Sequence, residues 1–219
     1  PVTVEAGRRL QSLTGRGQVV HPAQIGQLNA PLAEGPRGRW DEGNTIELLI
    51  EAADLSRAAE FDVLSGENML LVEGASGWEA VSFREADIVG ANSWRLSGLL
   101  RGVQGSPAVS AEAGAIVLVV TKELERMPVS REEIGTELLW RAGTSDIVPY
   151  THQDLAGLPW AVAHLRAAPS PAGGLTVSWV PCGADIPDSW DLPDPLRVRL
   201  FDVRGLREGA ETVSFQTSE

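Results

Sequence analysis

The sequence predicts an all-β protein built from modules, and three features of its 219 residues lead to that prediction. Short segments that alternate apolar and polar residues recur along the chain, as expected for half-buried strands. Clusters of Gly, Asn, Ser and Pro separate these segments at close spacing, as turns separate strands. The strand patterns also do not alternate with long helical patterns, which argues against an α/β barrel.

Composition excludes several classes of protein. The net charge of −12 argues against binding to nucleic acid or to anionic membranes, because both need clustered Lys and Arg. The longest apolar run, residues 115–120, is far shorter than the roughly 18 residues of a membrane span. The single cysteine, Cys182, is expected to be a small buried hydrophobe. No spacing of Cys and His suggests zinc, so we expect no metal or other cofactor.

The N-terminal half divides at residue 44. Residues 1–44 are interpreted as an irregular Gly- and Pro-rich segment, and residues 45–122 as a β-rich module. Strands are expected in this module at 45–52, 69–72, 78–84, 94–100 and 115–120. The glycines of 74–77 are expected to form a hairpin turn. Residues 56–64 have helical propensity, but Phe61 and Val63 alternate with acidic residues, which favours a strand.

The C-terminal half begins with a connecting segment, residues 123–158. Within it, residues 130–142 are ambiguous: Ser130 and Glu133 match a capping box, whereas the Gly135-Thr136 interruption favours a strand, which we prefer. Residues 159–219 contain alternating segments at 175–180, 196–204 and 212–215. This order is that of an immunoglobulin- or fibronectin type III-like β-sandwich that is incomplete. The first residue is not Met, so we expect the chain to be part of a longer polypeptide.

Catalytic patterns are few. The three histidines are far apart, and neither a nucleophile elbow nor a P-loop is present. Acidic pairs such as Asp41 with Glu42 are interpreted as solvated surface, although a glycosidase also needs two carboxyl groups. The Asp185–Asp194 stretch offers clustered oxygens for Ca²⁺, but without the density of a calcium loop. We therefore predict no catalytic and no metal site in this chain.

Seven tryptophans accompany one tyrosine, and their surroundings divide them into two groups. Those inside expected strands are predicted to be core residues: Trp78, Trp94, Trp140 and Trp179. The other three lie among Gly, Pro and Asp in turns, where an exposed indole can contact a partner or stack on a sugar: Trp40, Trp160 and Trp190.

The most distinctive stretch is SWRLSGLLRG, residues 93–102. Its apolar residues predict a packed strand that runs into a turn. Its glycines, Gly98 and Gly102, suit a tight backbone. We expect Arg95 and Arg101 on the outer face, paired with carboxylates or with a neighbouring subunit.

This stretch resembles the C-terminal region of a phage tail-tip family, the large baseplate hub proteins of gene transfer agents and related siphophages. The specific part comprises Trp94, Leu96, Gly98, Leu99, Leu100, Arg101 and Gly102. Further matching residues are Trp40-Asp41, Gly43-Asn44, Trp78-Glu79, Phe83, Ala86 and Gly105-Ser106. The family usually has Thr at position 106 and often Tyr at position 94. The resemblance covers about residues 36–180, which includes the start of the fibronectin-like module.

The resemblance implies a structural component of a virion tail tip, assembled in the bacterial cytoplasm and acting outside at the host envelope. Such hubs are typically homotrimers around the tail axis, contact other tail and baseplate proteins, and meet a bacterial surface glycan or receptor. A glycosidase-like TIM barrel would lie further toward the N-terminus, so this segment is expected not to be an enzyme. The alternative, suggested by the tryptophans and carboxylates, is a carbohydrate-binding or glycoside-hydrolase-associated segment that acts on envelope polysaccharide.

Overall fold

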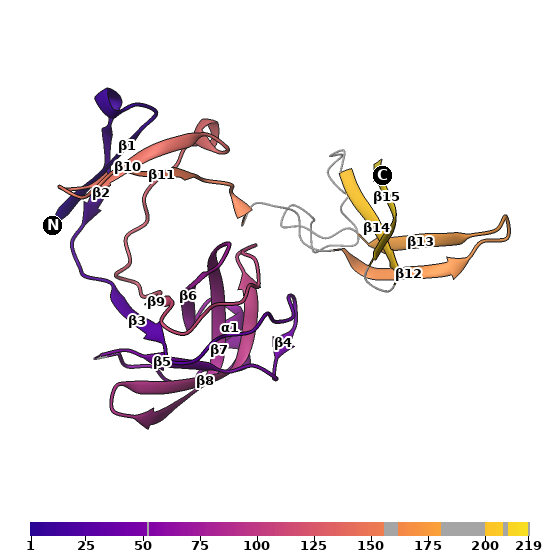
Figure 1. Cartoon of the computed structure of the whole chain (residues 1–219), viewed down its shortest axis with the longest axis horizontal. Coiled ribbons are helices and arrows are strands. Elements are labelled where there is room, and N and C mark those ends of the chain that lie inside the picture. The colour runs from indigo at the N-terminus through magenta and orange to yellow at the C-terminus, as the bar shows by residue number, and fades with distance from the viewer. Residues whose placement is uncertain (52, 156–161, 181–199, 208–209, 219) are drawn as a thin grey trace. The chain divides into compact units, whose positions relative to one another are not determined.

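The chain forms two compact units, Pro1–Leu158 and Pro159–Glu219 (Figure 1). The structure, a computed structural model, describes residues 1–51, 53–155, 162–180, 200–207 and 210–218. Strands dominate both units, which confirms the predicted all-β class. Across these described ranges, no helix has both the length and the apolar character that a membrane span requires.

The middle part of the first unit's sequence forms a closed antiparallel barrel (Figure 1). Its strands are β3 (Gln24–Leu28), β5 (Ile46–Leu49), β6 (Met69–Gly74), β7 (Gly77–Gly90), β8 (Ser93–Val103) and β9 (Ile116–Val119). The spatial order is β8-β5-β3-β9-β6-β7, and β7 pairs back onto β8 to close the ring. A two-residue strand, β4 (Trp40–Asp41), also pairs with β8.

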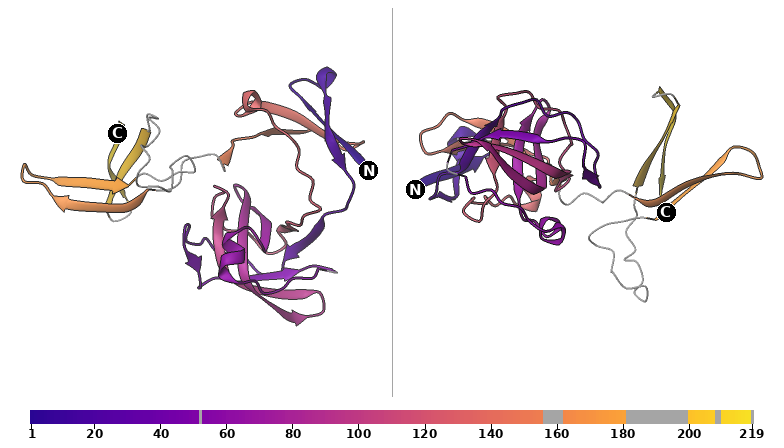
Figure 2. Two further views of the ribbon diagram at one scale, coloured as in Figure 1. Left: turned by 180° about the vertical axis from the view of Figure 1, so that it is seen from behind. Right: turned by 90° about the horizontal axis from the view of Figure 1, so that it is seen from below.

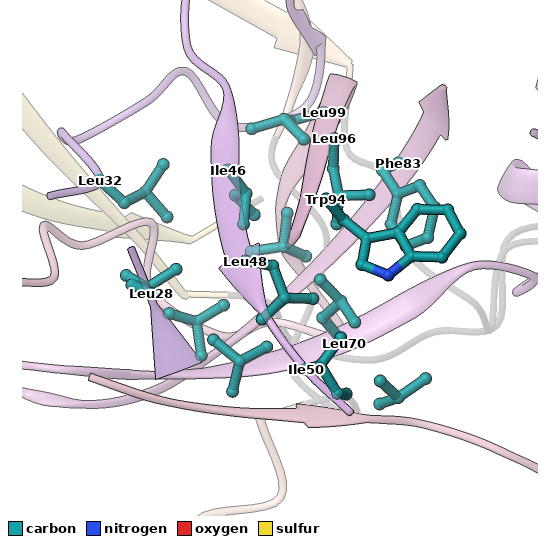
Figure 3. Close-up of a cluster of buried hydrophobic side chains, with 14 of the residues drawn as sticks. Leu28, Leu32, Ile46, Leu48, Ile50, Leu70, Phe83, Trp94, Leu96 and Leu99 are labelled. Atoms are coloured by element: carbon teal, nitrogen blue, oxygen red, sulfur yellow. The ribbon is translucent and has the colours of Figure 1, made fainter. Parts of the chain in front are cut away.

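The barrel core follows from the alternation in the sequence. In β5, Ile46 and Leu48 are fully buried while Glu47 and Leu49, which alternate with them, are half-buried, as the period of two requires. All buried residues of the main apolar cluster lie between Leu28 and Val119 (Figure 3). The predicted hairpin turn at 74–77 is confirmed, because Gly74 and Gly77 are paired at the end of β6 and β7.

Residues Glu60–Leu64 form a short helix, α1, so the strand predicted over 56–64 is wrong. Local backbone bonds from Val63 to Ala59 and from Ser65 to Phe61 satisfy this segment without a neighbouring strand. Only Val63 is buried, whereas Phe61 is 78% exposed. Phe61 and Val63 therefore do not share a buried strand face, and the backbone hydrogen bonds of the helix determine the conformation of this segment.

A second sheet has the order β11-β10-β1-β2 and combines the two ends of the first unit. Its strands are β1 (Val2–Gly7), β2 (Thr14–Val19), β10 (Glu137–Ala142) and β11 (Val148–Thr151), and a short 3₁₀ turn spans Leu10–Ser12. Residues 1–44 are therefore not irregular throughout, and 123–158 is more than a connection. The Gly-rich β2 shows little alternation, and β1 finds its partner β10 more than a hundred residues away, so no local pattern announced this sheet.

Both interpretations of residues 130–142 hold in part. Arg131–Glu133 forms a 3₁₀ turn whose capping box joins Ser130 and Glu133, and β10 begins four residues later. The Glu133 carboxylate also accepts two hydrogen bonds from the Arg16 guanidinium of β2, one at 3.0 Å. This ion pair attaches the segment between β9 and β10 to strand β2 of the four-stranded sheet. The hydrogen bonds from Arg16 and from the Ser130 backbone lower the pKa of Glu133 from 4.5 to about 2.

In the second unit the described residues form two antiparallel hairpins (Figure 2). One pairs β12 (Ala163–Pro169) with β13 (Leu175–Val180), and the other pairs β14 (Leu200–Arg207) with β15 (Ala210–Ser218). The rings of Trp179 and Phe201 contact each other with centroids 5.3 Å apart, which joins β13 to β14. Cys182 and the Asp185–Asp194 stretch lie outside the described residues.

We expect the barrel to fold on its own. Gln24 and Val119 are paired, so the two ends of residues 23–119 lie together, and the segment contains its whole apolar cluster. The excised segment should show a β-type circular dichroism spectrum and cooperative thermal unfolding. Its Leu96→Ala variant should be about 2–5 kcal/mol less stable, because Leu96 is fully buried. An excised segment without cooperative unfolding would contradict this prediction.

Glu133 should make the four-stranded sheet sensitive to acid. Its pKa is lower in the folded state, so its contribution to stability is complete above pH 4.5 and is lost as the pH falls toward 2. Acid titration of Glu133→Gln should lack this component, and Glu132→Gln is the matched control. Identical acid unfolding curves for Glu133→Gln and the unmodified chain would refute the assignment.

Candidate functional site

The signature strand β8 changes its facing direction at Gly98. Before that residue, Trp94 and Leu96 are buried and Arg95 is exposed. After it, Leu99 and Arg101 are buried. Gly98 has φ +61°, a left-handed conformation that interrupts the regular pleat. Arg95 lies on the outer face as expected, with Glu47 at 3.2 Å, whereas the prediction of an outward Arg101 is wrong.

The Arg101 guanidinium uses all five of its N–H donors inside the protein. Its Nε and Nη2 donate to the two carboxylate oxygens of Glu79 on β7, at 2.7 and 2.8 Å. The remaining donors reach the carbonyl oxygens of Ala33 and Val109, both at 2.9 Å, and Oδ2 of Asp41 at 3.5 Å. One buried side chain therefore joins two barrel strands, β4 and two loops.

The two carboxylates in this cluster are equally well partnered. Glu79 also accepts hydrogen bonds from the backbone N–H groups of Gly102 and Val109, at 3.0 and 3.1 Å. Burial raises the pKa of Asp41, but hydrogen bonds from Asn44 and from a neighbouring backbone N–H, together with the Arg101 charge, lower it below 3.8 overall. The cluster is thus a fully bonded centre closed to solvent. Its hydrogen bonds hold β4 and two loops to the barrel strands.

Close packing explains both signature glycines. A Cβ on Gly98 would lie 2.6 Å from Nε of Arg84, which crosses the backbone there. A Cβ on Gly102, which has φ +63°, would lie 2.9 Å from both the Arg37 Nε and the Ser106 carbonyl oxygen. The Ser106 hydroxyl accepts from the Ala80 N–H and donates to a carbonyl of β8, both at 2.8 Å. A threonine at position 106 would preserve this hydroxyl.

Of the three tryptophans predicted to lie in turns, the structure describes Trp40, which lies in β4 and not in a turn, and its ring is already in contact. The Arg84 guanidinium carbon lies 4.4 Å from the ring centroid, a cation–π geometry. The indole N–H of Trp40 donates to Glu60 at 3.1 Å, and Arg84 forms an ion pair with Glu42. One face of the ring is therefore unavailable for stacking on a sugar. Trp160 and Trp190 lie outside the described residues.

The tryptophans predicted as core residues divide in the structure. Trp94 is buried in the barrel, 9% exposed, whereas Trp78 is 44% exposed, so its assignment to the core is wrong. Trp78 lies beside the β6–β7 turn and pairs with Glu73. Trp140 and Trp179 are half-buried.

Asp41 was interpreted together with Glu42 as solvated surface, and this is wrong for Asp41, which is 4% exposed and bonded to Arg101 and Asn44. The burial of Glu79 was not predicted, although a signal existed for Glu79. It shares the strand face of Val81 and Phe83, so alternation alone places it inward. A hollow of about 580 Å³ on the first unit includes Ile25, Ile116 and Glu51 in its lining, and Glu51 is its one ionisable residue. The described residues contain no group of three His, Cys, Asp or Glu side chains suited to a metal ion.

Comparison with known families gives a match to part of the chain. Residues 23–118 match the family model described as "Rcc01698-like, C-terminal". The matched segment coincides with the barrel, from the residue before β3 to the penultimate residue of β9, and contains Arg101 with all five of its acceptors. It fits the resemblance to a gene-transfer-agent-related family. No curated protein matches the chain.

Replacing Arg101 should expose the energetic weight of the cluster. Arg101→Met leaves the Glu79 carboxylate buried without its counter-charge, so the free energy of unfolding should fall by about 3–5 kcal/mol. Arg95→Met, on the same strand, should cost about 1 kcal/mol or less because that pair is exposed. Urea unfolding of both variants measures the difference, and equal losses would refute the assignment.

Proposed function

We propose that this chain is a structural component of a phage-like tail tip, within a baseplate hub of the gene-transfer-agent type. The observation that carries the proposal is the match of residues 23–118 to the Rcc01698-like family model, on the barrel that contains the LSGLLRG stretch. The proposal thus rests on two agreeing signs, the signature residues and the family match.

The physical role of the signature supports a structural reading. Arg101, Gly98 and Gly102 are all committed to internal contacts that fix the barrel and its loops. A motif spent on internal contacts identifies a shared scaffold, since residues that act on a substrate must remain accessible to it. In this reading the barrel provides a rigid body that other tail proteins can surround.

The proposal places the protein at the tip of the virion tail, assembled in the cytoplasm and acting at the host envelope. Its partners would be further copies of itself, in a homotrimer around the tail axis, and other tail and baseplate proteins. The assembly would contact a bacterial surface glycan or receptor during DNA delivery. We propose no catalysis by this segment.

Immunogold labelling of particles tests the location directly. An epitope inserted in the β12–β13 turn, within the exposed residues 171–174, should be tolerated because that hairpin tip is exposed. Gold should be found at the tail end opposite the head in electron micrographs. Gold absent from purified particles, or distributed along the tail, would refute the proposal, and particles without the epitope serve as the control.

A genetic experiment links the buried cluster to assembly. Arg101→Met in the parent gene should reduce the yield of particles with complete tails, because it destabilises the barrel. Arg95→Met should leave the yield unchanged, since that pair is exposed. Counting complete particles by electron microscopy distinguishes the two outcomes. Hydrolysis of host envelope polysaccharide by this chain would instead favour the alternative function.

A further inference from the structure

One edge of the barrel sheet lacks a neighbour. Strand β7 pairs with β6 through Ser82 and continues along β8 as far as Gly90. The backbone N–H of Ala58 bonds to the Arg84 carbonyl, and no named strand of the described chain pairs with the edge of β7 beyond that point. The unpaired part runs from Ala86 to Ile88, and a bulge at Val89 ends it.

The backbone groups of Ala86 and Ile88 point toward this open edge. The Ile50 N–H bonds to the Asn92 carbonyl, in the same register that pairs Leu48 with Trp94. Because bonded pairs alternate in an antiparallel ladder, Trp94 bonds toward β5 and Arg95 bonds toward β7. Asp87, opposite Arg95, therefore bonds toward β8, which leaves the N–H and C=O groups of its two neighbours directed outward.

Side chains form two rows across β5, β8 and β7 that both end at this edge. On the inner face, exposure rises along the row from 0% at Leu48 to 9% at Trp94 and 72% at Ile88. On the outer face, the charges alternate from Glu47 to Arg95 to Asp87. Arg95 forms its ion pair with Glu47, and no ion pair to Asp87 is found among the described residues.

We propose that the edge Ala86–Ile88 accepts an extended peptide segment of a partner protein, which adds as a further strand beside β7. The partner has basic and apolar residues in alternation. Its basic residue continues the charged row beside Asp87, and its apolar residue covers Ile88. The backbone bonds are made at Ala86 and Ile88, as in other strand additions. Asp87 then lies at a position without backbone bonds to the incoming strand, where cross-strand side chains approach most closely.

This inference goes beyond the proposed function and does not depend on it, since it uses only the contacts of β5, β7 and β8. A tail tip would offer many protein partners, but the recognition chemistry is that of any short basic–apolar strand. The bulge at Val89 restricts the addition to a few residues.

NMR titration of the full chain with a capped hexapeptide of alternating lysine and valine tests the proposal. Saturable shifts should centre on Ala86–Ile88, and the amides of Ala86 and Ile88 should gain protection from hydrogen exchange. The same peptide with glutamate in place of lysine should bind more weakly, by a factor of up to about five, as expected for one cross-strand charge pair. No saturable binding, or shifts centred elsewhere, would overturn the proposal.

Two variants separate strand addition from nonspecific attraction. Asp87→Lys should reverse the preference, so that the glutamate peptide binds more tightly than the lysine peptide. Ile88→Pro removes an outward N–H while leaving the bonds to β8 in place, and it should weaken binding of the lysine peptide at least about tenfold. If Ile88→Pro unfolds the chain, the reversal by Asp87→Lys still decides. Peptide binding that neither variant changes would overturn the proposal. So would a dimer of this chain that depends on Ile88 and that the lysine peptide does not dissociate.

Discussion

The first unit depends on the buried ion pair of Arg101 and Glu79. Removing two charges from water costs several kcal/mol for each ion, and the arrangement is stable only when every donor and acceptor is satisfied. Here that condition is met by groups from β4 and two loops as well as from the barrel strands. Apolar burial is not directional, so the core alone would not fix these loops. The Arg101 hydrogen bonds are directional and therefore fix the positions of β4 and of the loops at Ala33 and Val109.

Gly98 allows one strand to carry both an exposed and a buried arginine. Arg95 and Arg101 are six residues apart, so a regular strand would present them on the same face. The left-handed conformation at Gly98 shifts the alternation by one residue, and β7 shifts opposite it, from buried Phe83 to packed Ala86. The guanidinium of Arg84 occupies the space that a side chain at Gly98 would need. The glycine therefore sets the direction of Arg101 and also the position of Arg84 against Trp40.

Much of the barrel could be predicted from alternation, since β5 and β8 bury the residues that the period of two selects. The outward assignment of Arg101 agreed with strict alternation and with the preference of charges for water. It failed because Gly98 shifts the alternation by one residue and because the Glu79 carboxylate offsets the cost of burying the guanidinium. The sheet of β1, β2, β10 and β11 could not be predicted locally, because its central pairing joins residues about 135 positions apart. The resemblance of the signature fits the family model that matches the barrel residues, but it did not predict the buried position of Arg101.

The division between interior and surface decides which residues can distinguish one function from another. Arg101 and Glu79 are closed to solvent and the signature glycines are occupied by backbone and side-chain contacts, so their substitution reports on stability whatever the protein does. The family match covers the barrel residues that make these internal contacts. Partner recognition must therefore reside in accessible groups. On the described barrel these include the open edge at Ile88, because the row of side chains that begins fully buried at Leu48 ends there without cover.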